Sequence, residues 1–161
     1  MREKNGLYEY IGVYVDDLLI ISKAPQVITD MLEEKHKFKL KGTGEITFHL
    51  GCDFFRDDDG TLCMAPKKCI EKLIDGYHNM FREKPKTRYK SPLESGDHPE
   101  MDHSKFLGED GVQKYQSLIG SIQWAVSIGR LDVATAVMTL SGYRSIPRQG
   151  HLERTRRVIR Y

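Results

Sequence analysis

Two adjacent acids, Asp16 and Asp17, stand in the middle of a stretch from Tyr8 to Ser22 that is otherwise rich in β-branched and aromatic residues. Adjacent carboxylates repel each other and resist burial, so they destabilise a buried strand unless a cation or solvent compensates them. Aspartate does tolerate the unusual backbone angles of a tight turn. The stretch therefore predicts two strands joined by a turn at residues 15–17, with both carboxylates at the tip of the hairpin.

The residues after this hairpin predict a helix and a second hairpin. Apolar side chains recur at helical spacing over residues 25–35, with polar residues between them, which indicates a helix packed on a surface. Residues 46–55 are typical of a strand, and three aspartates and a glycine at residues 57–60 predict a turn. A second short strand is expected at residues 61–65.

The remaining residues predict helices separated by a long connector. Residues 84–111 are rich in Lys, Pro, Gly, Asp and His and are expected to form this connector. Apolar residues recur at helical spacing at residues 70–74, 118–126, 133–140 and after Pro147. Asp132 is the expected N-cap of the third of these helices. The predicted fold class is therefore α+β, with a strand-rich part over residues 1–65 and a helical part over residues 66–161.

The composition limits the classes of function. The formal net charge of +2 is too small to indicate nucleic-acid binding by the chain as a whole, but the end is basic, with six arginines from Arg144 to Arg160 against one acid, Glu153. The apolar stretch from Val13 to Ile21 is too short to span a bilayer, and the first residues are not those of a signal peptide. We therefore expect no membrane association, an intracellular protein, and three cysteines that are free thiols.

The acidic turn suggests a metal site. Two carboxylates at the tip of a hairpin can share divalent cations and leave coordination positions open for phosphate oxygens, as phosphoryl or nucleotidyl transfer requires. Mg²⁺ suits such a site best, because it needs only one or two protein carboxylates and takes its other ligands from water and substrate. From their spacing alone, an exposed turn without function is the better explanation of the two aspartates, because turn propensity already accounts for aspartate there.

Four separated segments of the chain then match one family in the family's own order. Residues 14–20 read Tyr-Val-Asp-Asp-Leu-Leu-Ile, residues 38–51 read Phe-Lys-Leu-Lys-Gly-Thr-Gly-Glu-Ile-Thr-Phe-His-Leu-Gly, residues 115–122 read Tyr-Gln-Ser-Leu-Ile-Gly-Ser-Ile, and residues 157–161 read Arg-Val-Ile-Arg-Tyr. These segments resemble the acidic hairpin, the stretch leading into the primer-grip hairpin, the thumb helix and a closing segment of the reverse transcriptases of copia-type LTR retrotransposons. The resemblance covers nearly the whole chain.

The resemblance implies a partial polymerase palm, with antiparallel hairpins and a helix, over residues 1–65, and a helical thumb over residues 66–161. Asp16 and Asp17 would be two of the three catalytic carboxylates of an RNA-directed DNA polymerase and would bind its two Mg²⁺ ions. Tyr14 would lie with Val15 beside the primer end and the incoming nucleotide. The implied partners are an RNA or DNA primer–template and a deoxynucleoside triphosphate, and the implied location is the cytoplasm, with retroelement particles.

The same resemblance implies roles outside the acidic turn. His49, Leu50 and Gly51 would form the primer grip, where a glycine lets the backbone come close to nucleic acid. Lys39 or Lys41 would donate a proton to pyrophosphate, although each of these lysines, taken singly, is also typical of a solvated face. The basic end would contact the nucleic-acid backbone through three residues, Arg154, Arg156 and Arg157.

The chain also departs from the family. Residues 128–132 lack the proline of the family's Thr-Arg-Pro-Asp, and His49 stands where an apolar residue is common. Residues 1–10 contain neither the strand that carries the first catalytic aspartate nor the fingers. We therefore expect the rear part of a reverse transcriptase, which by itself does not polymerise and binds nucleic acid and Mg²⁺ weakly or not at all.

Two alternatives remain open. A cyclase or metal nuclease with paired acids would need a third ligand, and the scattered histidines offer no spaced pair. A non-catalytic nucleic-acid-binding or interaction module, left from a truncated retroelement, would instead self-associate through an exposed edge of the palm sheet. In either case Trp124, which has apolar Ile122 and Ala125 beside it, is expected to pack inside the thumb and not to serve as a stacking platform.

Overall fold

The computed structural model describes residues 2–4, 7–86 and 89–161. The chain forms two compact units, Met1–Thr47 and Phe48–Tyr161, which we call the hairpin unit and the helical unit. Each unit contains its own antiparallel sheet and at least one helix, which confirms the α+β fold class. The second predicted hairpin belongs to the same compact unit as the helices. The division at residue 65 into palm and thumb stays a prediction.

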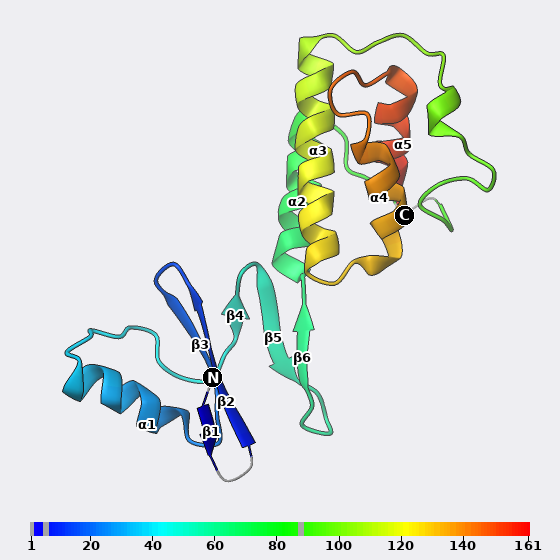
Figure 1. Cartoon of the computed structure of the whole chain (residues 1–161). Coiled ribbons are helices and arrows are strands. Elements are labelled where there is room, and N and C mark those ends of the chain that lie inside the picture. Colours follow the sequence, from blue (N-terminus) through cyan, green and yellow to red (C-terminus); the bar gives the residue numbers. More distant parts are fainter. Residues whose placement is uncertain (1, 5–6, 87–88) are drawn as a thin grey trace. The chain divides into compact units, whose positions relative to one another are not determined.

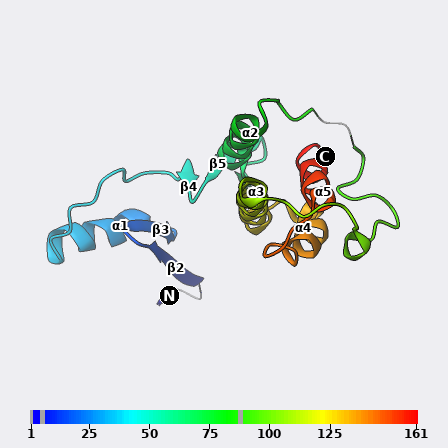
Figure 2. The ribbon, with the colours of Figure 1, turned by 90° about the horizontal axis from the view of Figure 1, so that it is seen from above.

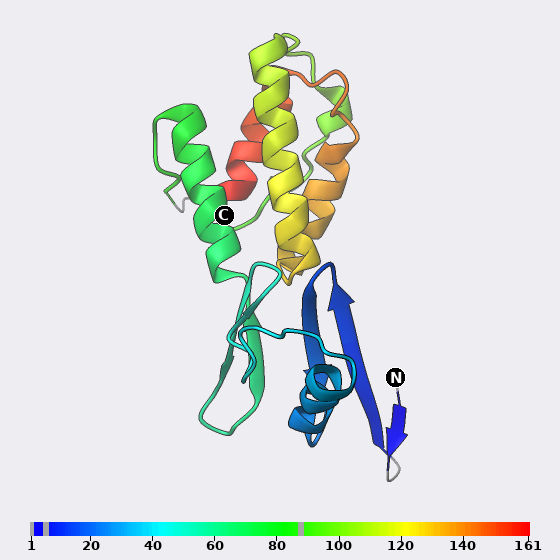
Figure 3. The same cartoon turned by 90° about the vertical axis from the view of Figure 1, so that its left-hand side faces the viewer.

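The hairpin unit is built around the long hairpin that the sequence predicts. Strand β1 (Arg2–Lys4) pairs with β2 (Leu7–Tyr14), which pairs with β3 (Asp17–Ile21), in the order β1-β2-β3. Helix α1 (Pro25–Asp30) follows and continues as a π-helical turn, Met31–Lys35, so the predicted helix is confirmed. Figure 3 shows β2, β3 and α1 in blue and cyan.

The hairpin unit has almost no core of its own. Among its described side chains only Ile28, on α1, is buried. The apolar side chains of β2 and β3 that remain exposed are Tyr8, Tyr10, Ile11, Val13, Tyr14, Leu18 and Ile21. Because successive strand residues point to opposite faces, this set leaves apolar surface on both faces of the sheet.

The sheet of the helical unit corrects one prediction. Residues 46–55 do not form a continuous strand, because a two-residue turn separates β4 (Phe48–His49) from β5 (Cys52–Arg56). Both turn residues, Leu50 and Gly51, have positive φ angles, +50° and +87°, as in a type I′ hairpin turn. Leucine rarely adopts such angles, so its presence gave no turn signal. Strand β6 (Leu62–Ala65) then pairs with β5 as predicted.

Four helices follow the sheet, and α3 is the central one (Figures 1 and 2). They are α2 (Lys67–Phe81), α3 (Glu109–Ser127), α4 (Ala134–Ser141) and α5 (Gln149–Ile159). Helix α3 packs against the other three. The buried core consists of Tyr77, Tyr115, Leu118, Ile119, Ile122, Val133, Ala136, Val137, Leu140, Leu152 and Val158. Among the helices of the described residues, none is both long and apolar enough to cross a lipid bilayer.

Two helix predictions need correction. Helix α2 is longer than the predicted short helix, because Tyr77 and Phe81 extend the apolar spacing to its end, and Tyr77 is buried. Asp132 does not cap α4 and lies in a 3-10 turn, Leu131–Val133. Its carboxylate accepts hydrogen bonds from Nε and Nη2 of Arg130, both at 2.8 Å. Because this carboxylate pairs with Arg130, it does not cap the first turn of α4.

The connector between α2 and α3 is attached to α5 along much of its length. Arg154 on α5 contacts both oxygens of Asp97 through Nε, at 3.0 and 2.9 Å, and its Nη1 lies 2.5 Å from Oδ2 of Asp102. His151 on α5 is buried, with Nε2 2.9 Å from the carbonyl oxygen of Pro99. The described residues of the predicted connector from 97 to 102 are therefore attached to the helical unit.

Gly150 makes room for this attachment. A Cβ atom at this position would lie 1.8 Å from Oδ2 of Asp102 and 2.8 Å from Nη1 of Arg154. The amide of Gly150 also donates to Oγ of Ser104 at 2.8 Å, and Ser104 in turn donates to the other oxygen of Asp102. Burial alone raises the pKa of Asp102, but the hydrogen bonds from Ser104 and Arg154 lower it to about 2, so the pair is charged at neutral pH.

We predict that Gly150→Ala destabilises the helical unit by about 2–4 kcal/mol, because the added methyl group forces apart a largely buried ion pair. Urea denaturation followed by circular dichroism measures this loss. Gly76→Ala on α2 is the matched control, since a Cβ there meets no atom within 4 Å. The control should gain about 0.5–1 kcal/mol from helix propensity, and equal stability of the two variants would contradict the prediction.

Candidate functional site

The acidic turn is a strained two-residue loop. Tyr14 pairs with Asp17 across the hairpin, so Val15 and Asp16 form the loop between β2 and β3. Val15 has a φ of +54° and Asp16 has no positive φ, the pattern of a type II′ turn, in which the first position usually carries glycine. A β-branched residue is strained there. The side chain of Val15 is 85% exposed, so no packing contact explains its presence.

Both carboxylates of the turn are exposed, at the end of the hairpin where the sequence predicts them. Within the described ranges, no group of three or more His, Cys, Asp or Glu side chains could hold a metal ion. Two carboxylates fit the modest protein contribution that Mg²⁺ requires, provided that water and phosphate oxygens supply the other ligands. The turn can therefore contribute to a magnesium site that substrate completes.

The resemblance assigns roles at this turn to Tyr14 and to two lysines, and the structure places them differently from one another. Tyr14 is the last residue of β2, and its side chain is exposed. Lys39 and Lys41 are exposed in an irregular stretch after the π-helical turn. In the described part of the hairpin unit, neither lysine forms an ion pair with Asp16 or Asp17, so their role as proton donors stays a prediction.

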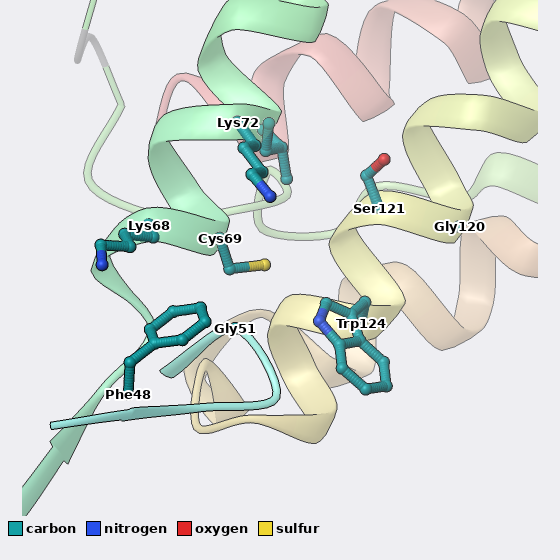
Figure 4. A pocket seen from close by; sticks show the side chains of 9 residues that line it. Phe48, Gly51, Lys68, Cys69, Lys72, Gly120, Ser121 and Trp124 are labelled. Carbon is teal, nitrogen blue, oxygen red and sulfur yellow. The ribbon is translucent and has the colours of Figure 1, made fainter. Parts of the chain in front are cut away.

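The second motif, His49-Leu50-Gly51, comprises the last residue of β4 and the two residues of the β4–β5 turn, and Gly51 lines a groove. The groove has a volume of about 390 Å³ and is lined by Phe48, Gly51, Lys68, Cys69, Lys72, Leu73, Gly120, Ser121 and Trp124. Figure 4 shows Cys69 and Lys72 on α2, Ser121 and Trp124 on α3, and the turn with Gly51 below them. Three sequence-distant segments therefore meet at one surface.

Glycines keep the groove open. A Cβ atom at Gly120 would meet nothing within 4 Å, so the backbone of α3 is uncovered there. At Gly51 a Cβ would lie 3.5 Å from Nε1 of Trp124, which is ordinary contact, but the φ of +87° favours glycine. Both positions allow a ligand to approach the backbone closely.

The groove carries positive charge and an aromatic surface. Nζ of Lys68 lies 4.3 Å from the ring centroid of Phe48 and 3.5 Å from Oδ1 of Asp53, so its charge is partly compensated. Lys72 is exposed, and no described acid forms an ion pair with it. Trp124 is 45% exposed. A cation beside an exposed aromatic ring is a combination that binds nucleic acid through phosphate and base contacts.

The thiols at the groove are not nucleophiles. All three cysteines are free, as predicted, and Cys52 is buried below the groove. Burial raises the pKa of Cys69, and the neighbouring Cys52 raises it further, against the opposite effect of Lys72. Cys69 therefore stays a thiol at neutral pH and contributes shape and polarity to the groove.

The prediction for Trp124 is wrong, because its ring lines the groove and does not pack inside the helical unit. Its apolar neighbours in sequence misled the prediction, since residues one and two positions apart on a helix do not share a face. The buried face of α3 runs through Tyr115, Leu118, Ile122 and Ala125. Counting that period would have placed Trp124 off the face, above Gly120.

The arginines predicted to contact nucleic acid form ion pairs with acidic residues of the same chain. Arg154 pairs with Asp97 and Asp102. The other pairs are Arg156 with Glu83, at 2.5 Å, and Arg157 with Glu94, at 2.6 Å. Contact of these arginines with a nucleic-acid backbone stays a prediction, but each would have to share its charge with a carboxylate.

Comparison with known proteins relates the chain to transposons. It is 30% identical over 156 residues to a transposon Ty5-1 protein of Saccharomyces cerevisiae, which is 94% of this chain and 48% of that protein. It is also 28% identical to the retrovirus-related Pol polyproteins from transposon RE1 of Arabidopsis thaliana and transposon TNT 1-94 of Nicotiana tabacum, over 94% and 92% of this chain but only 10% and 11% of those proteins. The chain is thus related over most of its length to one region of retrotransposon Pol polyproteins.

The chain spans about half the length of the yeast relative and about a tenth of the plant polyproteins. No protein-family model matches it, and no solved structure is similar to it.

We predict that Val15→Gly stabilises the acidic hairpin by about 1 kcal/mol. The relief of about 1–3 kcal/mol of backbone strain exceeds the entropic cost of about 0.5–1 kcal/mol for a glycine. Amide hydrogen exchange of β3 residues should slow in this variant. Val13→Gly, in the middle of β2, is the control and should accelerate exchange; faster exchange in both variants would show that Val15 is not strained.

Proposed function

We propose that this chain is the part of a copia-type reverse transcriptase that carries two of the metal-binding carboxylates and binds the primer–template. In the complete enzyme the reaction is RNA-directed DNA synthesis by two-metal nucleotidyl transfer. The observation that carries the proposal is the groove, where an uncovered stretch of α3 at Gly120, an exposed Trp124 and Lys72, which pairs with no described acid, lie beside the primer-grip-like turn. The relation to retrotransposon Pol polyproteins supports it.

The groove suits a duplex or a strand better than a small metabolite. It is formed where α2, α3 and the β4–β5 turn meet (Figure 4), and its lining includes the exposed side chains of Phe48, Lys68, Lys72 and Trp124. A phosphate near Lys72 gains charge compensation, while the ring of Trp124 offers a flat apolar contact to a sugar or a base. The Gly120 backbone is then the place of closest approach.

The acidic turn supplies the chemical part of the proposal. Asp16 and Asp17 would hold Mg²⁺ together with substrate phosphates, and the metal would activate the primer hydroxyl and neutralise charge on the leaving pyrophosphate. Asp16 lies in the strained loop and Asp17 is the first residue of β3, and both side chains are exposed. Tyr14 and Val15 are the residues next to them and would contact the primer end and nucleotide.

One observation favours a second candidate, a non-catalytic nucleic-acid-binding module left from a retroelement. The described residues contain no group of three metal-ligating side chains, whereas the implied catalytic site uses three carboxylates. Such a module would keep the groove but would bind no divalent cation at the acidic turn. Its exposed apolar strands would also favour self-association, which sedimentation velocity would detect.

We predict that Gly120→Ala weakens duplex binding about tenfold, or about 1.4 kcal/mol, because the methyl group occupies the place of closest approach. It should not destabilise the chain, since alanine is the better helix former. Binding is measured by anisotropy of a labelled RNA–DNA duplex and by the fluorescence of Trp124, the one tryptophan in the sequence.

Gly76→Ala is the matched control for this test, because it adds the same methyl group to α2 at a position that does not line the groove. The control should bind as the wild type does. Equal weakening of both variants, or no change in the Trp124 fluorescence on binding, would contradict the assignment of the groove.

We also predict that Mn²⁺, as a paramagnetic substitute for Mg²⁺, selectively broadens the amide signals of Asp16 and Asp17 at millimolar concentration. Added deoxynucleoside triphosphate should lower the Mn²⁺ concentration at which this broadening appears, because its phosphates complete the coordination of the ion. The double variant Asp16→Asn, Asp17→Asn should lose the effect. Broadening that survives in this variant would place the metal elsewhere and favour the non-catalytic module.

A further inference from the structure

A short basic segment follows α2, and its side chains alternate. Arg82, Lys84 and Lys86 are exposed, whereas Glu83 and Pro85 between them are half-buried. Alternation of this kind is typical of an extended segment with one face on the protein and one in solvent. We call the three exposed cations the basic ridge. Arg82 has left-handed backbone angles at the C-cap of α2, so extended alternation relates only Lys84 and Lys86.

Glu83 fixes the segment to the helical unit. Its carboxylate accepts hydrogen bonds from the hydroxyl of Tyr77 at 2.7 Å, from Nη2 of Arg156 at 2.5 Å, and from Nη2 of Arg160. Hydrogen bonds from Tyr77 and Arg156 lower the pKa of Glu83 to about 2. The one acid of the segment is therefore ionised and directed inward, where two arginines of α5 neutralise it.

The backbone of the ridge is constrained on both sides of Glu83. The amide of Arg82 donates to the carbonyl oxygen of His78 at 2.7 Å and ends α2 with a positive φ of +56°. Proline at position 85 fixes its own φ and holds Lys84 in an extended conformation. The cations are thus presented by an ordered backbone, which reduces the entropy lost on binding.

The ridge differs from the arginines of α5 in having no internal partner. Among the described residues, no acid forms an ion pair with Arg82, Lys84 or Lys86, while Arg154, Arg156, Arg157 and Arg160 each pair with one. Arg82 also lies at the C-terminal end of α2, where the helix dipole favours a bound cation and not a bound anion. Lys84 and Lys86 are therefore exposed cations whose charge no described acid compensates, as is Lys72 in the groove.

We propose that the basic ridge is a second nucleic-acid contact of the helical unit, which binds backbone phosphates without reading the bases. Three cations within five residues, separated by the inward-paired Glu83 and by Pro85 and with no aromatic side chain among them, fit a polyanion whose charge repeats along the chain. This inference rests on the proposed function and adds to the groove a separate contact that depends on charge alone. It replaces the arginines of α5 as the expected phosphate-binding group.

The test compares salt dependence. The double variant Lys84→Gln, Lys86→Gln should reduce the magnitude of the slope of log binding constant against log salt for a DNA duplex by about 1.8, because each lost phosphate contact removes about 0.9. The control Lys35→Gln, Lys105→Gln removes the same charge from exposed lysines elsewhere and should leave the slope nearly unchanged. Circular dichroism confirms that both variants keep the fold.

Each outcome decides between the ridge and the groove. An unchanged slope in the ridge variant, with binding still weakened by Gly120→Ala, overturns the ridge and leaves the proposed function standing. An equal reduction of the slope in the control and in the ridge variant also overturns the ridge, since any exposed lysine would then contribute equally to binding. If wild-type protein binds no duplex at low salt, the proposed function and the ridge both fail. Ridge-dependent binding of polyglutamate or anionic vesicles, but not of duplex, would overturn the ridge as a nucleic-acid contact.

Discussion

One guanidinium, that of Arg154, determines how the second half of the chain is organised. It lies between the carboxylates of Asp97 and Asp102 and joins α5 to a connector more than fifty positions earlier in the sequence. Both partners of the Asp102 contact are largely buried, so removing either one would leave a charge without compensation. Gly150 is required because the carboxylate occupies the space of its absent side chain. The attachment of the connector to α5 follows from this arrangement, and separate ion pairs with Glu83 and Glu94 neutralise Arg156, Arg157 and Arg160.

The two motifs that resemble polymerase elements share a physical property. Each lies on a hairpin tip, and each tip places a non-glycine aliphatic residue at positive φ, Val15 in one and Leu50 in the other. Neither residue is chosen for its turn propensity, since glycine or asparagine would serve the backbone better. Strain of this kind persists where the position of the neighbouring groups matters more than stability. The neighbours are the two acids in the first case and Gly51, at the groove, in the second.

Elements with regular patterning were predictable from the sequence, and contacts between distant residues were not. The acidic hairpin, α1, the β6 strand and the buried face of α5 follow from alternation or helical spacing. The β4–β5 turn escaped prediction because Leu50 has no turn preference, and Asp132 was assigned to a cap because its partner Arg130 is not visible in a local pattern. The groove could be predicted only in part. Gly51 was expected at a primer grip by resemblance, whereas Lys68, Lys72 and Trp124 become one site only when α2 and α3 pack together.

The ion pairs of α5 also have an evolutionary consequence. Asp97 and Glu94 of the connector each pair with an arginine of α5, so a neutral substitution at either residue would loosen the connector and at the same time uncover a guanidinium. A change that looks like simple loss of structure would then increase the attraction of the chain for any polyanion in its surroundings. Retroelement copies that accumulate such changes would at the same time become less well folded and bind polyanions more strongly. The two properties are coupled because the same carboxylates maintain both the fold and the charge balance.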